Sequence, residues 1–381
     1  MKQRRMLGAL ALLCIAGMLV APQAALLGAR SGLSMFLESV LPALMPFMIF
    51  SQLMISCGLV SGLSRALEPV MRPLFGCPGA SAFALCTSLA CGYPAGARVT
   101  GQLHAEGLLG DEDACKTALL CSTGGPVFIT GALGAGLLGS PQAGQLLLIS
   151  HLLAALLWGV LRAHLPQRHQ KKTVTPVCHA APSPSPQGLG AALAQAVSVS
   201  LVPMASVGAY MLLFAVLGNL LEHFGLLTLL GRGLLVALGP LGFTQPLCEA
   251  LPRAVLEMST GCGALVAAQG PSVWTLVLCA ATLGWGGLCV QAQSLDMLRG
   301  VPLKGSRLAY SKIGQALLSA LLCRLMLWIF PLAQAASAFQ QLPPLSPSAS
   351  TQIISGALLT LGAALLWLAV CILLRLFGRP R

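Results

Sequence analysis

Residues 90–98 read ACGYPAGAR, a run of small residues that interrupts an otherwise apolar part of the chain. Gly92 weakens a helix through its conformational freedom, and Pro94 lacks the backbone donor that a helix interior needs. Residues 122–126, STGGP, interrupt the following apolar run in the same way. The first half of the chain is therefore predicted to contain two helix breaks in succession.

The second half repeats this order of breaks. Residues 256–263 read LEMSTGCG, and residues 284–287 read GWGG within the next apolar run. From Gly92 to Gly261 the distance is 169 residues, and a similar distance separates the second member of each pair. Each motif alone is common in apolar helices, where small residues permit close packing and kinks. Four breaks in matching order instead indicate an internal repeat.

The composition is that of a membrane protein. The 381 residues are 56% hydrophobic and 8% charged, against about 25% charged residues in a typical soluble domain. This excludes an ordinary cytosolic enzyme and a disordered scaffold, because both need more polar surface. The net charge of +12 is spread between apolar runs and aromatic residues make up only 5%, so no nucleic-acid partner is expected.

Apolar runs of about 20 residues are long enough for a helix to cross a bilayer. Reading them between charges and turns predicts an all-α polytopic membrane protein with about eight transmembrane helices. These crossings are Met6–Leu27, Leu33–Val60, Thr117–Leu138, Ala143–Ala163, Leu201–Leu221, Ser272–Leu298, Leu308–Ala333 and Gln352–Leu374.

Two further apolar stretches, about 80–106 and 246–270, are too broken to cross as single helices, and we expect two re-entrant helical hairpins there. If the N-terminus is cytoplasmic, this topology puts 17 Lys and Arg residues on the cytoplasmic side and two, Arg30 and Arg232, outside. This distribution agrees with the positive-inside rule. The C-terminus is also predicted to be cytoplasmic. The cytoplasmic set is Lys2, Arg4, Arg5, Arg65, Arg72, Lys116, Arg162, Arg168, Lys171, Lys172, Arg299, Lys304, Arg307, Lys312, Arg375, Arg379 and Arg381.

This topology divides the chain into repeats of opposite orientation. Residues 1–30 form an N-terminal transmembrane helix, for which a signal-peptide interpretation stays open because Lys2 to Arg5 precede an apolar run. The remaining domains are a first repeat (31–164), a cytoplasmic linker rich in Ser and Pro (165–187), a second, inverted repeat (188–335), and an external loop with a C-terminal transmembrane helix (336–381).

Broken helices in matching positions of inverted halves indicate a transport site near the middle of the membrane. Irregular backbone in a bilayer is tolerated only where it is buried in protein or lines a cavity. Half-helix N-termini carry partial positive charge and free N–H groups, which suit an anionic group of a substrate.

Four runs together resemble one known family: residues 91–98, residues 125–131, residues 257–261 and residues 285–293. They resemble the sporulation integral membrane protein YlbJ family, which belongs to the nucleoside-recognition Gate domain group and is similar to concentrative nucleoside transporters. The resemblance covers about residues 33–335. It implies two re-entrant hairpins and two broken helices around a substrate site.

The resemblance also implies a role in endospore formation, in which dipicolinic acid leaves the mother cell across the outer forespore membrane. The family commonly has Asn just before the Gly-Pro pair, where this chain has Ser122-Thr123. Hydroxyl groups offer fewer hydrogen-bonding options than an amide. This difference bears on the substrate and leaves the implied architecture unchanged.

Two charged residues near the breaks are candidates for transport. Arg98 is predicted either to bind a substrate carboxylate or to extend to the cytoplasmic face. Glu257 is predicted to hold a coupling cation or proton, to pair with Arg98 or Arg324, or to cap the next half-helix. Arg324 is otherwise expected to be a structural partner of a buried acid.

The predicted substrate-binding set comprises the breaks and the polar residues beside them. Its members are Gly92, Tyr93, Pro94, Gly96, Arg98, Ser122, Thr123, Gly124, Gly125, Pro126, Glu257, Ser259, Thr260, Gly261, Trp285, Gly286, Gly287, Gln291 and Gln293. For the hydroxyls, glutamines and Tyr93, bonding within the protein is an equally open interpretation.

No catalytic triad, P-loop or HExxH motif is present, so we expect no enzyme activity and no cofactor. The 14 cysteines contain no CxxC pair and no Cys/His cluster at zinc spacing, so no metal site is predicted.

The sequence thus predicts a secondary transporter of a small anionic solute, coupled to a cation or a proton. By resemblance the solute is dipicolinic acid. The alternatives are a transporter of nucleosides or another small solute, and a membrane scaffold of the spore envelope that transports nothing. A homo-oligomer is compatible with the sequence.

Overall fold

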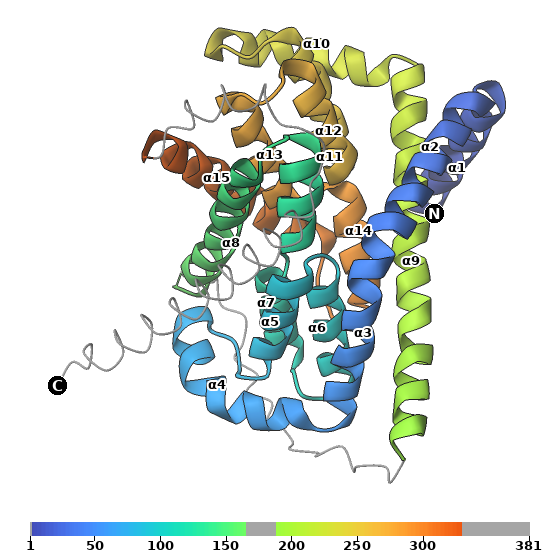
Figure 1. Cartoon of the computed structure of the whole chain (residues 1–381). Helices are drawn as coiled ribbons and strands as arrows, with labels where there is room; N and C mark the ends of the chain where they lie inside the picture. Colours follow the sequence, from blue (N-terminus) through green and yellow to red (C-terminus); the bar gives the residue numbers. More distant parts are fainter. Residues whose placement is uncertain (1, 165–187, 330–381) are drawn as a thin grey trace.

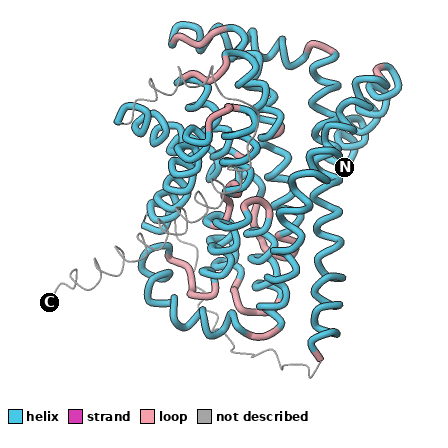
Figure 2. Tube along the Cα trace, viewed as in Figure 1, coloured by secondary structure: helices cyan, strands magenta, loops and turns pink. Residues whose placement is uncertain are grey.

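A computed structural model describes residues 2–164 and 188–329 of the chain. Within these ranges the protein is entirely helical, and Figure 2 shows the helices joined by short loops without a strand. The predicted all-helical fold is confirmed. The helices of the first half are α1 (Lys2–Val20), α2 (Pro22–Met35), the π-helical segment η1 (Phe36–Val40), α3 (Leu41–Ser56), α4 (Leu59–Phe75), α5 (Ser81–Cys91), α6 (Ala95–Ala105), α7 (Asp111–Leu120), the π-helical segment η2 (Val127–Leu137) and α8 (Pro141–His164).

The second half repeats the order of the first from a long helix onward. Each half has a long helix, a shorter amphipathic helix, a pair of short helices, a helix broken near its centre, and a second long helix. The helices of the second half are α9 (Leu189–His223), α10 (Leu226–Leu238), the short 3₁₀ segment η3 (Gly239–Leu241), α11 (Gln245–Leu256), α12 (Met258–Gln269), α13 (Val273–Trp285), α14 (Gly287–Met297) and α15 (Gly305–Ile329).

Five helical stretches of the described chain are long and apolar enough to cross a membrane: 22–56, 141–164, 190–223, 273–297 and 305–329. The protein is a polytopic membrane protein. Shorter apolar helices account for the predicted first crossing and for the broken run 117–138. The predicted crossing Gln352–Leu374, the linker 165–187 and the end of the crossing Leu308–Ala333 lie outside the described residues.

The N-terminal boundaries differ from the prediction. The chain turns at Ala21, whose φ and ψ are −124° and 62°, in the middle of the predicted crossing Met6–Leu27. From Pro22 the helix continues through η1 to Ser56, so the predicted crossing Leu33–Val60 starts earlier and ends earlier. The physical reason is Pro22, which has no N–H for a helix that reaches it from Val20 and which fits the first turn of a new helix.

Two amphipathic helices that the sequence analysis did not single out lie across opposite ends of the molecule. Figure 1 shows α4 running across one end and α10 across the other. Each begins after a glycine with the same backbone conformation, Gly58 and Gly225, both with φ 71° and ψ 8°. Matching elements at opposite ends are what an inverted repeat produces, and helices of this kind lie at membrane interfaces.

Two hydrophobic clusters form the core. One joins α4, α5, α6 and α7 with the segment between α14 and α15, and includes Phe75, Leu103 and Leu303. The other joins η2, α8, the pair α11–α12, α13 and α15, and includes Leu147 and Leu283. Helices α2, α3 and α9 pack together beside this body (Figure 1). The core thus holds the short helices and the broken helices against each other.

Candidate functional site

All four predicted helix breaks are present. In the first half, Gly92 (φ 84°) ends α5, and residues 121–126 are unwound between α7 and η2. The two breaks lie against each other, because a Cβ on Gly92 would overlap the backbone nitrogen of Gly125, and a Cβ on Gly125 would overlap the carbonyl oxygen of Cys91. Only glycine allows two backbones to come this close.

Hydroxyl groups hold the first pair of breaks together. The Ser88 and Thr123 hydroxyl oxygens are 2.8 Å apart, and Thr123 also donates to the Ser88 carbonyl at 2.8 Å. Gly96 packs against the carbonyl of Cys121 at the end of α7. Thr123 is fully buried, so its side chain is occupied within the protein. The carbonyl of Ser122 faces the interior instead, as described below.

In the second half, Glu257 is the extended residue between α11 and α12 (φ −143°, ψ 126°). Its two carboxylate oxygens accept hydrogen bonds from the backbone N–H groups of Ser259 at 2.9 Å and Thr260 at 2.7 Å. The carboxylate is 6% exposed. Of the roles predicted for Glu257, the structure therefore shows the cap of the following half-helix. No ion pair joins Glu257 to Arg98 or Arg324 within the described residues.

The break between α13 and α14 lies against the same hairpin. Gly286 and Gly287 have φ values of 78° and 76°, which L side chains rarely adopt. A Cβ on Gly287 would be 2.9 Å from the Met258 backbone nitrogen. The indole of Trp285 donates to the carbonyl of Val255 at 3.0 Å. Each half of the protein thus packs its hairpin break directly against its broken helix.

Tyr93 connects the two halves. It lies at the tip of the first hairpin, and its hydroxyl donates to the carbonyl of Leu283 in α13 at 2.8 Å. A Cβ on Gly286 would be 3.4 Å from the Tyr93 ring. The ring also meets the imidazole of His151 edge-on, with centroids 6.5 Å apart. The tip of the first hairpin therefore reaches the second broken helix.

Lys312 of α15 is at the same junction, and here the sequence analysis was wrong. It counted Lys312 among the cytoplasmic charges, but the side chain is 1% exposed and lies inside the protein. Its Nζ donates to the Tyr93 hydroxyl at 2.9 Å, to the Ser122 carbonyl at 2.9 Å and to Oε1 of Gln315 at 2.7 Å. The sequence signal that was missed is the position of Lys312 inside the run Leu308–Ala333, which was already predicted to cross the membrane.

His151 of α8 is a second residue that the sequence analysis passed over. It is fully buried, and its Nε2 accepts the backbone N–H of Gly124 at 2.7 Å. Its Nδ1 has no hydrogen-bond partner in the described residues, and neither does Nε2 of Gln315. No metal-ligand spacing in the sequence singles out His151, because its partner is the backbone N–H of Gly124, 27 residues earlier in the chain.

Arg98 does not face the breaks. It is half-buried on α6, donates to the carbonyl of Val199 in α9 at 3.1 Å, and lines a cleft of about 340 Å³ between α6, α9 and α14. Asp296 and Arg299 line the same cleft, and they form an ion pair. A cleft of this size has room for a small organic solute.

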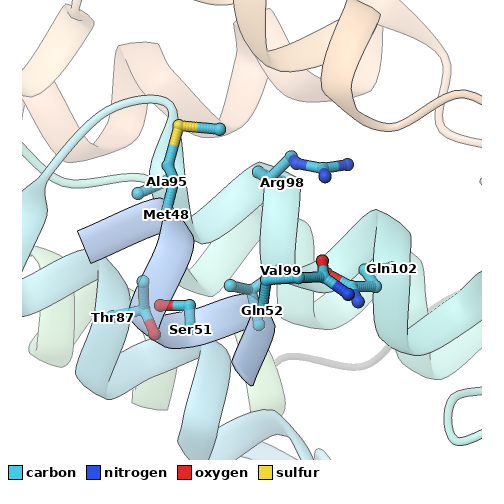
Figure 3. A pocket seen from close by; sticks show the side chains of 8 residues that line it. All are labelled: Met48, Ser51, Gln52, Thr87, Ala95, Arg98, Val99 and Gln102. Carbon is cyan, nitrogen blue, oxygen red and sulfur yellow. The ribbon is translucent and has the colours of Figure 1, made fainter. Parts of the chain in front are cut away.

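A smaller crevice lies where α3 meets the first hairpin, and Figure 3 shows side chains from α3, α5 and α6 meeting there. Its volume of about 10 Å³ has room for one water molecule. Gln52 lines it with an Oε1 atom that has no partner in the described residues. The crevice is therefore too small to hold a substrate.

The remaining predicted residues bond or pack within the protein, close to their own breaks. Gln291 donates to the carbonyl of Trp285 at 3.3 Å and Gln293 to the sulfur of Cys289 at 3.2 Å. Pro94 caps α6 and Pro126 caps η2. Gly261 packs against Ala254, which holds the arms of the second hairpin together.

Other charged residues have different surroundings from those expected. Arg324 is exposed and has no ion pair within the described part of the chain, so its predicted role as partner of a buried acid was wrong. Arg253, which precedes the second break, pairs with Glu222 and donates to Asn219 of α9 at 2.6 Å. One arginine of each hairpin, Arg98 in the first and Arg253 in the second, therefore bonds to α9.

Two comparisons relate this chain to known proteins. The family model "Gate: Nucleoside recognition" matches residues 37–158. The sporulation integral membrane protein YlbJ of Bacillus subtilis (strain 168) is 29% identical over 320 residues, which cover 81% of this chain and 78% of the relative. The chain is thus similar to YlbJ over most of its length. No solved structure matches it significantly.

The similarity to an integral membrane protein agrees with the multi-pass helical fold. The Gate match lies in the first half, from α3 to α8, and so includes Gly92, Tyr93 and the unwound segment 121–126. The match to YlbJ extends over most of the chain and therefore also takes in part of the second half. The protein is an integral membrane protein, and its first half matches the nucleoside-recognition Gate model.

Proposed function

We propose that this protein is a secondary transporter of a small anionic solute. The observation that carries the proposal is a buried cation at the two breaks of the first half, which Tyr93 links to a break of the second half. Lys312 donates to the Tyr93 hydroxyl and to the unwound carbonyl of Ser122, and the Tyr93 ring lies beside Gly286. Irregular backbone at membrane depth is expected where a solute or an ion passes.

The charges near the breaks favour an anion. Lys312 is a buried cation at the first break, whereas the carboxylate of Glu257 at the second break is occupied by two backbone N–H groups. Arg98 adds positive charge to the cleft that lies beside the first hairpin, where Arg299 is balanced by Asp296. We propose this cleft as the entrance for the solute, because positive charge in a cleft raises the local concentration of anions.

Dipicolinic acid is the solute we propose, exported from the mother cell across the outer forespore membrane. The family resemblance supports this choice, and a dianion of that size suits a cleft of about 340 Å³ that is lined by two arginines. In the topology that the positive-inside rule predicts, both termini face the cytoplasm. The basic residues on α4, Lys116 in the middle of α7 and Arg162 at the end of α8 then face the mother-cell cytoplasm.

Flux into vesicles tests the proposal. The full chain is reconstituted in liposomes and the movement of dipicolinate is measured, with uridine in parallel. We expect dipicolinate flux in the wild type, with a loss of tenfold or more in Gly92→Leu and Gly287→Leu, because both side chains would collide with neighbouring backbone. Gly233→Leu on the exposed face of α10 is the matched control, since its Cβ has open space.

The outcomes separate the candidate functions. Uridine flux without dipicolinate flux supports the second candidate, a nucleoside transporter, which the Gate match favours. Absence of flux for both solutes in folded wild type leaves a non-transporting scaffold and refutes transport of either. Undiminished flux in folded Gly92→Leu and Gly287→Leu variants shows that solute does not pass the breaks.

A further inference from the structure

The hydrogen-bond partners of Lys312 match those of an ammonium group. Three groups surround Nζ: the Tyr93 hydroxyl, the Ser122 carbonyl and Oε1 of Gln315. The Tyr93 hydroxyl already donates its hydrogen to the Leu283 carbonyl, so it accepts from Lys312. All three neighbours therefore accept. Only an ammonium group has three N–H donors and needs no donor in return.

This ammonium has no carboxylate partner. None of the ion pairs within residues 2–164 and 188–329 includes Lys312, although its side chain is 1% exposed. Its neighbours are a hydroxyl, a backbone carbonyl and an amide oxygen. Neutral oxygens of these kinds also coordinate cations in proteins.

Two of the three oxygens belong to helix breaks. Tyr93 is at the tip of the first hairpin, and Ser122 is in the unwound segment that follows α7. In transporters built from inverted repeats, carbonyls of unwound segments and C-terminal ends of half-helices coordinate the coupling ion. The Nζ of Lys312 occupies a position of this kind, and it comes from α15 of the other half.

We propose that the Lys312 ammonium is a tethered cation that permanently fills a monovalent-cation position at the junction of the first hairpin and the first broken helix. The second half differs, since its break carries the capping carboxylate of Glu257 instead. The wild type then takes up no exchangeable Na⁺ or K⁺ at this junction. This consequence for coupling rests on the proposed transport function, whereas the cation position itself does not.

Lys312→Ala tests the cation position directly, because it removes the ammonium and leaves its three oxygens around an empty space. The melting temperature of the purified full-length protein is measured in chloride salts of ammonium, K⁺, Na⁺ and choline at equal ionic strength. We expect the variant to melt lower than wild type in choline. Ammonium is expected to raise its melting temperature by roughly 3 °C or more, since a ligand that binds only the native state stabilises it.

Lys312→Met is the matched control, because its side chain fills the space without a charge and leaves no room for an ion. We expect its melting temperature, and that of the wild type, to be the same in all four salts. In the Lys312→Ala, Tyr93→Phe double variant we expect the apparent affinity for ammonium to fall about tenfold, because one oxygen ligand is lost.

Three results would overturn the proposal. One is a Lys312→Ala protein that responds to none of the three cations. The second is a wild type that responds to them as strongly as the variant does. If Lys312→Ala cannot be purified in choline chloride, the third result is that the folded variant cannot be purified in ammonium, K⁺ or Na⁺ chloride either. Flux is not needed for any of these measurements, so a failure of the transport proposal is detected separately.

Discussion

Replacing Gly261 by Ala tests the close packing of the second hairpin. Gly261 lies in the first turn of α12, and a Cβ there would overlap the Cα of Ala254 in α11 and lie 2.8 Å from its Cβ. An ordinary contact at this position is at least 3.4 Å. The arms of the hairpin must therefore separate by at least 0.6 Å to accept one methyl group.

Gly263, two residues further along the same helix, is the matched control. A Cβ at Gly263 has nothing within 4 Å. Overpacking a close contact costs about 1–3 kcal/mol, whereas Ala is favoured over Gly in a helix by about 0.5–1 kcal/mol. Both positions lie in α12 and share the helix gain, so the two variants should differ by about 1–3 kcal/mol in free energy of unfolding.

Thermal unfolding of the purified variants measures this difference. We expect Gly261→Ala to melt at least about 2 °C below Gly263→Ala, given a shift of about 2 °C or more for each kcal/mol. Dipicolinate flux should fall in the first variant and remain in the second. Equal melting temperatures would refute the close approach of α11 and α12, and with it the hairpin as the element that carries Glu257.

Three further predictions follow from the charges and from the inverted repeat. Arg98→Gln should raise the KM for dipicolinate severalfold with little change in maximal rate if the cleft is the entrance, and an unchanged KM would place the entrance elsewhere. Glu257→Gln should lower stability by about 1–3 kcal/mol, because an amide oxygen and an NH₂ group replace two acceptors of backbone N–H groups; a melting temperature equal to that of wild type would exclude the cap. Single cysteines at Arg65 on α4 and Arg232 on α10 should be labelled by a membrane-impermeant thiol reagent from opposite sides of the bilayer, and labelling from one side only would contradict the inverted arrangement.

Much of the fold could be predicted from local chemistry. Gly92, Pro94 and the pair Gly286-Gly287 break helices wherever they occur, because the cause lies in the residue itself. The boundary at Pro22 had the same kind of cause and was missed, because hydropathy was averaged across it. The amphipathic helices α4 and α10 were passed over for another reason, since at 17 and 13 residues both are shorter than a crossing.

The candidate site could be predicted only in part. The residues of the breaks were found, but what each side chain does there depends on its neighbours. Arg98, five residues after Tyr93, faces a cleft beside α9 instead of the breaks. The predicted role of these residues in binding a substrate stays a prediction.

The order of apolar runs and helix-breaking residues determined a great deal by itself: a polytopic helical membrane protein, two short hairpins and two broken helices. These features depend on side-chain polarity and backbone conformation, which each residue carries with it. The tertiary structure decided which charges are buried and what they contact. Lys312 was counted as a cytoplasmic charge because a lysine is costly to bury, and only the folded chain brings Tyr93, Ser122 and Gln315 close enough to supply the three oxygens that offset this cost.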